Sequence, residues 1–94
     1  MAKNWFRETL HPELQAGLRI DQPVYQGRTE FQSVLIFDND LLGRVLVLDD
    51  VVQTTERDEF IYHEMLAHVP LLALEQPSEV LIIGGGDGGC LEEV

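Results

Sequence analysis

Residues 80–89 restrict the possible fold more than any other stretch of the sequence. They form the segment Val-Leu-Ile-Ile-Gly-Gly-Gly-Asp-Gly-Gly, a short apolar run followed by a glycine-rich loop. An apolar run of this length predicts a parallel strand that is covered on both faces. Because Gly84, Gly86 and Gly89 have the spacing G-x-G-x-x-G, the loop and the helix start after it can bring a ligand close to the backbone.

A carboxylate inside this loop changes the kind of ligand that the loop suits. Asp87 would repel the phosphate groups that such glycine loops often hold, so the loop favours a nucleoside or a cation. The same residues also fit a tight turn with no ligand, since glycine spacings of this kind occur by chance. On the loop alone, both interpretations remain open.

Length and charge narrow the class of protein further. The sequence has 94 residues and a formal net charge of −11. A single strand with the first turn of a helix cannot bury both of its faces, so we expect the N-terminal part of a longer protein. Nucleic acid and anionic membranes both require clustered Lys and Arg, which argues against either as a partner. The acidic composition suits a cationic substrate, or it serves solubility alone.

Cysteine and histidine usage bears on the compartment and on metal binding. Cys90 is the only cysteine, which fits a reducing compartment, and the sequence has neither a membrane-length apolar run nor the apolar core of a signal peptide. We therefore expect a cytoplasmic protein. His11 and His68 have no partners at metal-ligand spacing, so no metal site is predicted.

Alternating apolar runs and turn residues predict a small antiparallel β domain over residues 1–54. The expected strands cover residues 24–26, 33–37, 44–48 and 51–54. Turns are expected at residues 38–40 and 49–50, where Asn and Asp side chains can bond nearby backbone, and at Gly43. Pro23 indicates an edge strand or the start of a strand.

The second domain is predicted to begin with a helix and to cover residues 55–94. Thr55 is the expected N-cap, with acidic residues in the first turn, and Pro70 is expected to end or kink the helix. A broad apolar stripe is predicted for Phe60, Ile61, Met65, Ala67 and Val69. The hinge between the domains should lie near residues 53–57.

Two motifs together resemble the spermidine synthases, the aminopropyltransferase family. One is Gln-Thr-Thr-Glu-Arg-Asp-Glu-Phe at residues 53–60, and the other is Gly-Gly-Gly-Asp-Gly at residues 84–88. The resemblance runs from Trp5 through the glycine loop and so covers nearly the whole sequence. It implies an antiparallel β-sheet domain followed by the start of a Rossmann-like, methyltransferase-type domain whose remainder, with the general base, is expected beyond Val94. The 94 residues alone are therefore expected to be inactive.

The resemblance also implies a reaction in polyamine biosynthesis. An aminopropyl group would pass from decarboxylated S-adenosylmethionine, a co-substrate, to putrescine, giving spermidine and methylthioadenosine without a cofactor. Both substrates carry ammonium groups, which need carboxylates or hydroxyls as acceptors. Family members form homodimers or homotetramers, and the same is expected here. A putrescine N-methyltransferase and a non-catalytic oligomerisation module remain as alternatives.

Residue roles follow from the resemblance position by position. Binding of the donor or of methylthioadenosine is implied for Gln32, Gln53, Gly84, Gly85 and Gly86. Binding of the polyamine is implied for Tyr62, His63 and Asp87. Each role has a plainer alternative: the solvent face of a strand for Gln32, packing for Tyr62 and His63, and a loop cap for Asp87. The charged residues 56–59 are expected to serve mainly in capping and interdomain ion pairs.

Overall fold

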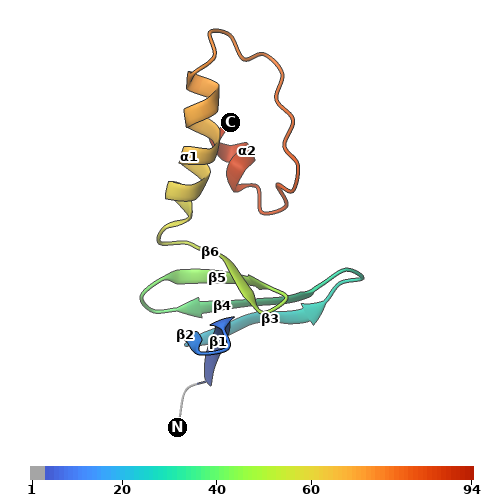
Figure 1. The fold of residues 1–94 in the computed structure, drawn as a ribbon. Helices are drawn as coiled ribbons and strands as arrows, with labels where there is room; N and C mark the ends of the chain where they lie inside the picture. The colour runs from blue at the N-terminus through green and yellow to red at the C-terminus, as the bar shows by residue number, and fades with distance from the viewer. Residues whose placement is uncertain (1–3) are drawn as a thin grey trace. The chain divides into compact units, whose positions relative to one another are not determined.

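A computed structural model describes residues 4–94, which divide into two compact units (Figure 1). The first unit extends to Arg57 and the second runs from Asp58 to Val94. This division lies three residues after the boundary between the predicted domains, residues 1–54 and 55–94. Within residues 4–94, no helix is long and apolar enough to cross a membrane.

The described part of the first unit is built from two antiparallel sheets. Strands β1 (Asn4–His11) and β2 (Leu14–Ile20) pair as a hairpin. The second sheet has the order β3-β4-β5-β6, with bounds β3 (Gln22–Arg28), β4 (Ser33–Asn39), β5 (Gly43–Leu48) and β6 (Val51–Thr55). Neighbours in this sheet follow one another in the chain. The prediction of an antiparallel β unit is thereby confirmed.

The turns of this sheet depend on the residues that the sequence analysis identified. Asp49 and Asp50 have φ of 49° and 63°, the left-handed values that a two-residue hairpin turn requires. At the next turn the side-chain carbonyl of Asn39 accepts hydrogen bonds from the backbone N–H of Leu41 and Leu42, at 2.9 and 3.0 Å. Pro23 lies near the start of β3, an edge strand, as predicted.

The core of the first unit joins the hairpin to the larger sheet. Its buried residues are Phe6, Phe37, Val45 and Val47. The rings of Phe6 and Phe37 lie 6.3 Å apart at an angle of 42°. Val45 and Val47 alternate along β5 and so point to the same face of the sheet. A side chain of this size contributes roughly 1.5 to 3 kcal/mol when fully buried.

The β1–β2 hairpin is an element that the sequence reasoning missed. Phe6 is its one residue in the buried core, whereas Trp5 and Leu14 are about half exposed. Alternation between buried apolar and exposed polar residues, the usual signal of a strand, is therefore weak here. The hairpin is held by its pairing, in which Phe6 lies opposite Leu18 and Arg7 opposite Gly17.

The second unit contains two helices joined by a long loop (Figure 1). Helix α1 (Glu59–Leu72) begins after Asp58, and α2 (Gly89–Glu93) follows the glycine loop. The predicted N-cap at Thr55 is wrong, because Thr55 is the last residue of β6 and pairs with Val45. The sheet ladder holds Thr55 extended, and residues 56–58 form the turn that leads into the helix.

Pro70 does not end the helix, which is one of the two effects that the sequence predicts for it. It lies inside α1, which continues to Leu72. A proline removes one backbone hydrogen bond of the helix. Because Pro70 lies near the end of α1, only a short part of the helix follows this loss.

Two further expectations for this unit differ from the structure. Residues 80–83, predicted to form the first strand, lie in the loop between the helices, with Leu81 and Ile83 exposed by 84% and 88%. A strand requires a neighbour to pair with, and the described residues of this unit contain no other strand. The predicted apolar stripe is also exposed apart from Ala67, which is buried beside His63.

Candidate functional site

The glycine loop leads into α2 through backbone conformations that glycine adopts readily. Gly84 and Gly88 both have φ of 76°, a left-handed value that residues with a Cβ rarely adopt. A Cβ at Gly84 or Gly86 would have no neighbouring atom within 4 Å, so these two glycines face open space. At Gly85 a Cβ would overlap the side chain of Ile82.

Asp87 has both of its carboxylate oxygens near a neighbour. Its Oδ1 accepts a hydrogen bond of 2.9 Å from the backbone N–H of Gly89, the first residue of α2. Its Oδ2 lies 3.5 Å from Nε2 of His63, and the side chain is 32% exposed. Asp87 therefore caps the loop and also faces the imidazole, while part of the carboxylate stays open to solvent.

Helix α1 supplies Tyr62 and His63 from neighbouring positions. His63 is buried, with 4% of its surface exposed, and its Nδ1 is hydrogen-bonded to Oε2 of Glu59 one turn earlier. Tyr62 is 62% exposed, and its ring lies edge-on to the imidazole with centroids 5.2 Å apart. The backbone of Gly89 covers the imidazole so closely that a Cβ there would overlap the ring.

Two of these contacts involve residues to which the sequence analysis gave no binding role. Glu59 was grouped with the charged residues of the helix start, and Gly89 with the general glycine pattern. The spacing of four residues between Glu59 and His63 was the available signal, because such residues are neighbours on a helix. No sequence pattern indicated that Gly89 would lie against the imidazole.

Gln32 and Gln53, the predicted donor contacts outside the glycine loop, belong to the first unit. Gln32 lies just before β4, where its backbone N–H donates to Oγ1 of Thr29 at 3.1 Å. Gln53 is exposed on β6 at a bulge, since the pairing with β5 shifts there and Gln53 is the extra residue. A bulge can re-aim a side chain. The structure therefore brings together the polyamine candidates and the glycine loop, all in the second unit.

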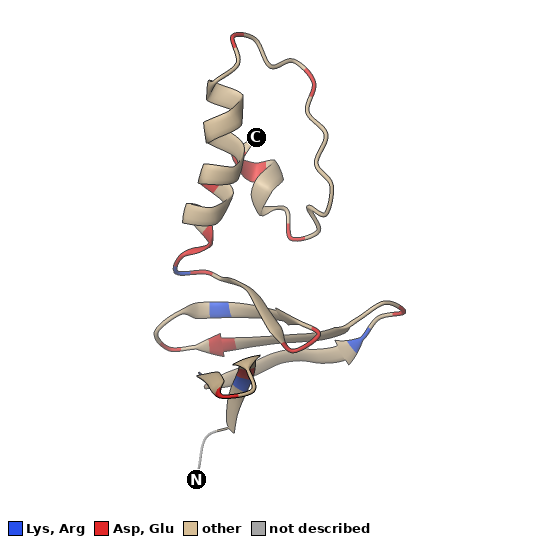
Figure 2. Cartoon of the chain, in the orientation of Figure 1, with Lys and Arg blue, Asp and Glu red and all other residues tan. Residues whose placement is uncertain are grey.

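The charged side chains of the second unit, apart from its histidines, are all acidic. Residues 58–94 contain eight Asp and Glu and neither Lys nor Arg, and Figure 2 shows acidic residues on α1, the loop and α2. The potential of such a surface attracts cations and repels phosphates. Within the described residues, no group of three or more His, Cys, Asp or Glu side chains is placed to hold a metal ion.

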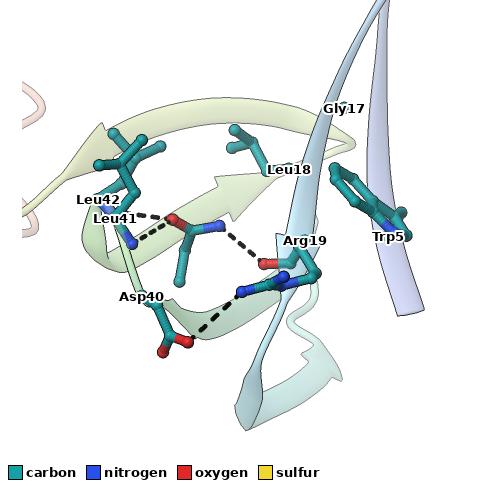
Figure 3. A pocket seen from close by; sticks show the side chains of 8 residues that line it. Trp5, Gly17, Leu18, Arg19, Asp40, Leu41 and Leu42 are labelled. Carbon is teal, nitrogen blue, oxygen red and sulfur yellow. Dashed lines mark hydrogen bonds and ion pairs between the residues drawn. The ribbon is translucent and has the colours of Figure 1, made fainter. Parts of the chain in front are cut away.

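A hollow of about 440 Å³ lies elsewhere, in the first unit (Figure 3). It is lined by Trp5, Gly17, Leu18, Arg19, Asn39, Asp40, Leu41 and Leu42. Arg19 reaches Asp40 across it at 3.5 Å, and a hydrogen bond to Asp21 is the main cause that raises the pKa of the Arg19 guanidinium. None of the predicted substrate-binding residues lines this hollow.

These features define a class of protein that joins an antiparallel β domain to a unit of two helices with an acidic glycine loop. Residues 4–56 match the family described as the spermidine synthase tetramerisation domain, and residues 59–94 match the spermine/spermidine synthase domain. The chain belongs to the spermidine synthase family.

Similar proteins and structures agree with this assignment. A protein named polyamine aminopropyltransferase from Pectobacterium carotovorum is 59% identical over 96% of this chain and 31% of its own length. One of the same name from Erwinia tasmaniensis is 57% identical over 100% of this chain and 33% of its own length. The crystal structure of spermidine synthase from Thermotoga maritima matches with a TM-score of 0.92 and 45% identity, over 96% of this chain and 32% of that one. A structure of spermidine synthase in complex with the transition state analogue AdoDATO matches with the same score and identity, over 96% of this chain and 31% of that one. The chain spans about a third of the length of these relatives.

Proposed function

We propose that the complete protein acts as a spermidine synthase, which transfers an aminopropyl group from decarboxylated S-adenosylmethionine to putrescine. The observation that carries the proposal is the carboxylate of Asp87, placed in a glycine loop beside His63 of a chain that belongs to this family. Relatives named polyamine aminopropyltransferase support it, as does the matching spermidine synthase structure with a transition state analogue.

The proposed reaction is a single displacement at carbon. The amine nitrogen attacks the carbon next to the sulfonium, and the new C–N bond forms as the C–S bond breaks. The sulfur keeps the bonding electron pair and leaves as the thioether of methylthioadenosine, while the nitrogen gives up a proton to a base. Because the positive sulfur already makes a good leaving group, positioning of the two substrates supplies much of the catalysis. We assign no general base among residues 4–94, and no cofactor or metal.

The amine substrate is assigned to the second unit. Asp87 would accept a charge-assisted hydrogen bond from an ammonium group, and the exposed hydroxyl of Tyr62 would help to orient the diamine. His63 belongs to the same group of residues, either as a contact of the amine or as a support for Asp87. The eight carboxylates of residues 58–94, without a Lys or Arg among them, suit a substrate of positive charge.

The sulfonium donor is assigned to both units. Gly84, Gly85 and Gly86 would let the thioadenosine part approach the loop, and the open space at the first and last of these supports that role. Gln32 and Gln53 would add contacts from the first unit.

Assembly is assigned to the first unit. The match of residues 4–56 to a tetramerisation domain supports a homodimer or homotetramer. Apolar side chains that remain about half exposed on the β1–β2 hairpin, namely Trp5, Leu10 and Leu14, could be covered by a second copy. The presence of Cys90 as the only cysteine supports a reducing, cytoplasmic location.

The product of the complete protein tests the proposal. With labelled putrescine and decarboxylated S-adenosylmethionine, mass spectrometry should detect labelled spermidine and methylthioadenosine. Methylated putrescine formed from uncleaved S-adenosylmethionine would instead establish an N-methyltransferase. Absence of product with either donor, in a protein that still assembles, would leave oligomerisation as the function. Residues 1–94 alone should give no product.

A further inference from the structure

A continuous series of contacts links Glu59 to the glycine loop. Oε2 of Glu59 is hydrogen-bonded to Nδ1 of His63, Nε2 of His63 faces Oδ2 of Asp87 at 3.5 Å, and Oδ1 of Asp87 accepts from the N–H of Gly89. We propose that Glu59 is a positioning residue that acts through His63 to hold the Asp87 carboxylate in place for the substrate ammonium. This inference rests on the proposed function, which assigns that ammonium to Asp87.

The chemistry of imidazole determines how Glu59 controls the ring. An ionised carboxylate only accepts hydrogen bonds, so Nδ1 must donate its proton to Glu59. With Nδ1 engaged in this way, Nε2 is the nitrogen that faces Asp87, and it holds that carboxylate by donating in turn, as both nitrogens do in the protonated ring. Glu59 thereby fixes both the orientation of the ring and the atom that it presents to the loop.

The burial of His63 makes the link rigid and makes its loss costly. The imidazole is covered by the backbone of Gly89 and has Tyr62 edge-on against it, so it has little freedom to move. Without the Glu59 carboxylate, the Nδ1 proton would be a buried donor with no acceptor, which is unfavourable. The ring would then be held from one side only, and its contact with Asp87 would no longer fix that carboxylate for the substrate.

The exposures of Asp87 and His63 assign these two residues different roles. Asp87 keeps 32% of its side chain exposed and can reach a ligand, whereas the His63 side chain is only 6% exposed. A buried imidazole between two carboxylates is suited to holding one of them in place. Direct contact with the ligand is assigned to Asp87 because it lies in the glycine loop, whereas Glu59 lies one helical turn before His63 and bonds its Nδ1.

Steady-state kinetics of the complete protein test the link. Glu59→Ala should raise the KM for putrescine by about ten-fold, the effect of losing a hydrogen bond to a charged group, and should leave the KM for the sulfonium donor unchanged. Glu59→Gln should raise the KM for putrescine much less than Glu59→Ala, because the amide oxygen can still accept a hydrogen bond from Nδ1. Glu64→Ala removes the same charge from the same helix and serves as the matched control, with an unchanged KM for putrescine.

A double-mutant cycle then separates positioning from direct binding. If Glu59 acts only through Asp87, adding Glu59→Ala to Asp87→Ala should have no further effect on the KM for putrescine. A further ten-fold rise in the double variant would show that Glu59 binds the amine by itself and would overturn the proposal.

Nuclear magnetic resonance distinguishes failure of this inference from failure of the proposed function. In the complete protein without substrate, Glu59→Ala should shift the ring nitrogen resonances of His63 and the amide resonance of Gly89, whereas Glu64→Ala should shift neither. Unchanged resonances in Glu59→Ala would refute the link, whatever the enzyme does. Shifted resonances in a protein that does not transfer aminopropyl groups would support the link and refute the function.

Discussion

Gly89 and Gly86 belong to the same loop motif, yet the structure predicts opposite effects when each is replaced by alanine. A Cβ at Gly89 would overlap the imidazole of His63, and the ring can yield only by leaving Glu59 and Asp87. A Cβ at Gly86 would meet no atom within 4 Å. The two substitutions are chemically identical, so each is the control for the other.

Two opposing effects determine how Gly89→Ala changes the free energy of unfolding. Forcing extra volume against a packed side chain costs about 1 to 3 kcal/mol. Gly89 is the first residue of α2, where alanine recovers about 0.5 to 1 kcal/mol over glycine. Gly89→Ala should therefore lower the free energy of unfolding by about 1 to 2 kcal/mol. Gly86→Ala should raise it slightly, by about 0.4 to 1 kcal/mol, because alanine restricts the unfolded chain.

Urea unfolding of the complete protein measures both values, and calorimetry with methylthioadenosine measures donor binding. Gly86→Ala should weaken methylthioadenosine binding in a protein of unchanged or higher stability. Gly89→Ala should reduce stability and also raise the KM for putrescine, since His63 and Asp87 move together. A Gly89→Ala protein as stable as the parent, with the same KM, would refute the close approach of this backbone to the imidazole.

Other substitutions test the remaining roles. Asp87→Asn should reduce activity and putrescine affinity by about 1 to 3 kcal/mol in a folded protein, because a charge-assisted contact becomes neutral; unchanged turnover and affinity would exclude the role. Tyr62→Phe should raise the KM for putrescine more than the KM for the donor, whereas equal effects with a lower melting temperature would indicate packing. Gln32→Ala should weaken methylthioadenosine binding by about 1 to 2 kcal/mol by calorimetry, and identical affinity would remove Gln32 from the donor site. Phe37→Ala, at a fully buried core position, should cost about 3 to 5 kcal/mol of stability, and a urea midpoint equal to that of the parent would contradict the core described above.

The β3–β6 sheet was predictable because its signals are local. Residues 45–48 of β5 form a run of β-prone apolar residues, and Asp49 and Asp50 supply the left-handed turn between β5 and β6. Both signals lie within a few residues of the structure that they specify. The β1–β2 hairpin has no equally strong signal, because Phe6 is its one buried core residue and its register depends on pairing with a second strand.

The errors arose where long-range pairing overrides local preference. Thr55 has the chemistry of an N-cap, but its pairing with Val45 keeps it in β6. Residues 80–83 have the composition of a buried strand, but a strand forms only with a partner, and the described part of the second unit holds none. In both cases the residue types have the local preference that the prediction used, but the tertiary surroundings determine the structure that forms.

The glycine motif shows most clearly what a pattern leaves undetermined. Geometry separates its members into residues that need glycine for their backbone, such as Gly84 and Gly88 with φ of 76°, and Gly89, which needs it to fit against His63. Neither requirement applies at Gly86, where φ is not left-handed and a Cβ would face open space. A glycine costs conformational entropy on folding, and at Gly86 no contact among the described residues offsets that cost. Close approach of the proposed donor would account for a glycine at this position, and an unchanged methylthioadenosine affinity in Gly86→Ala would refute that account.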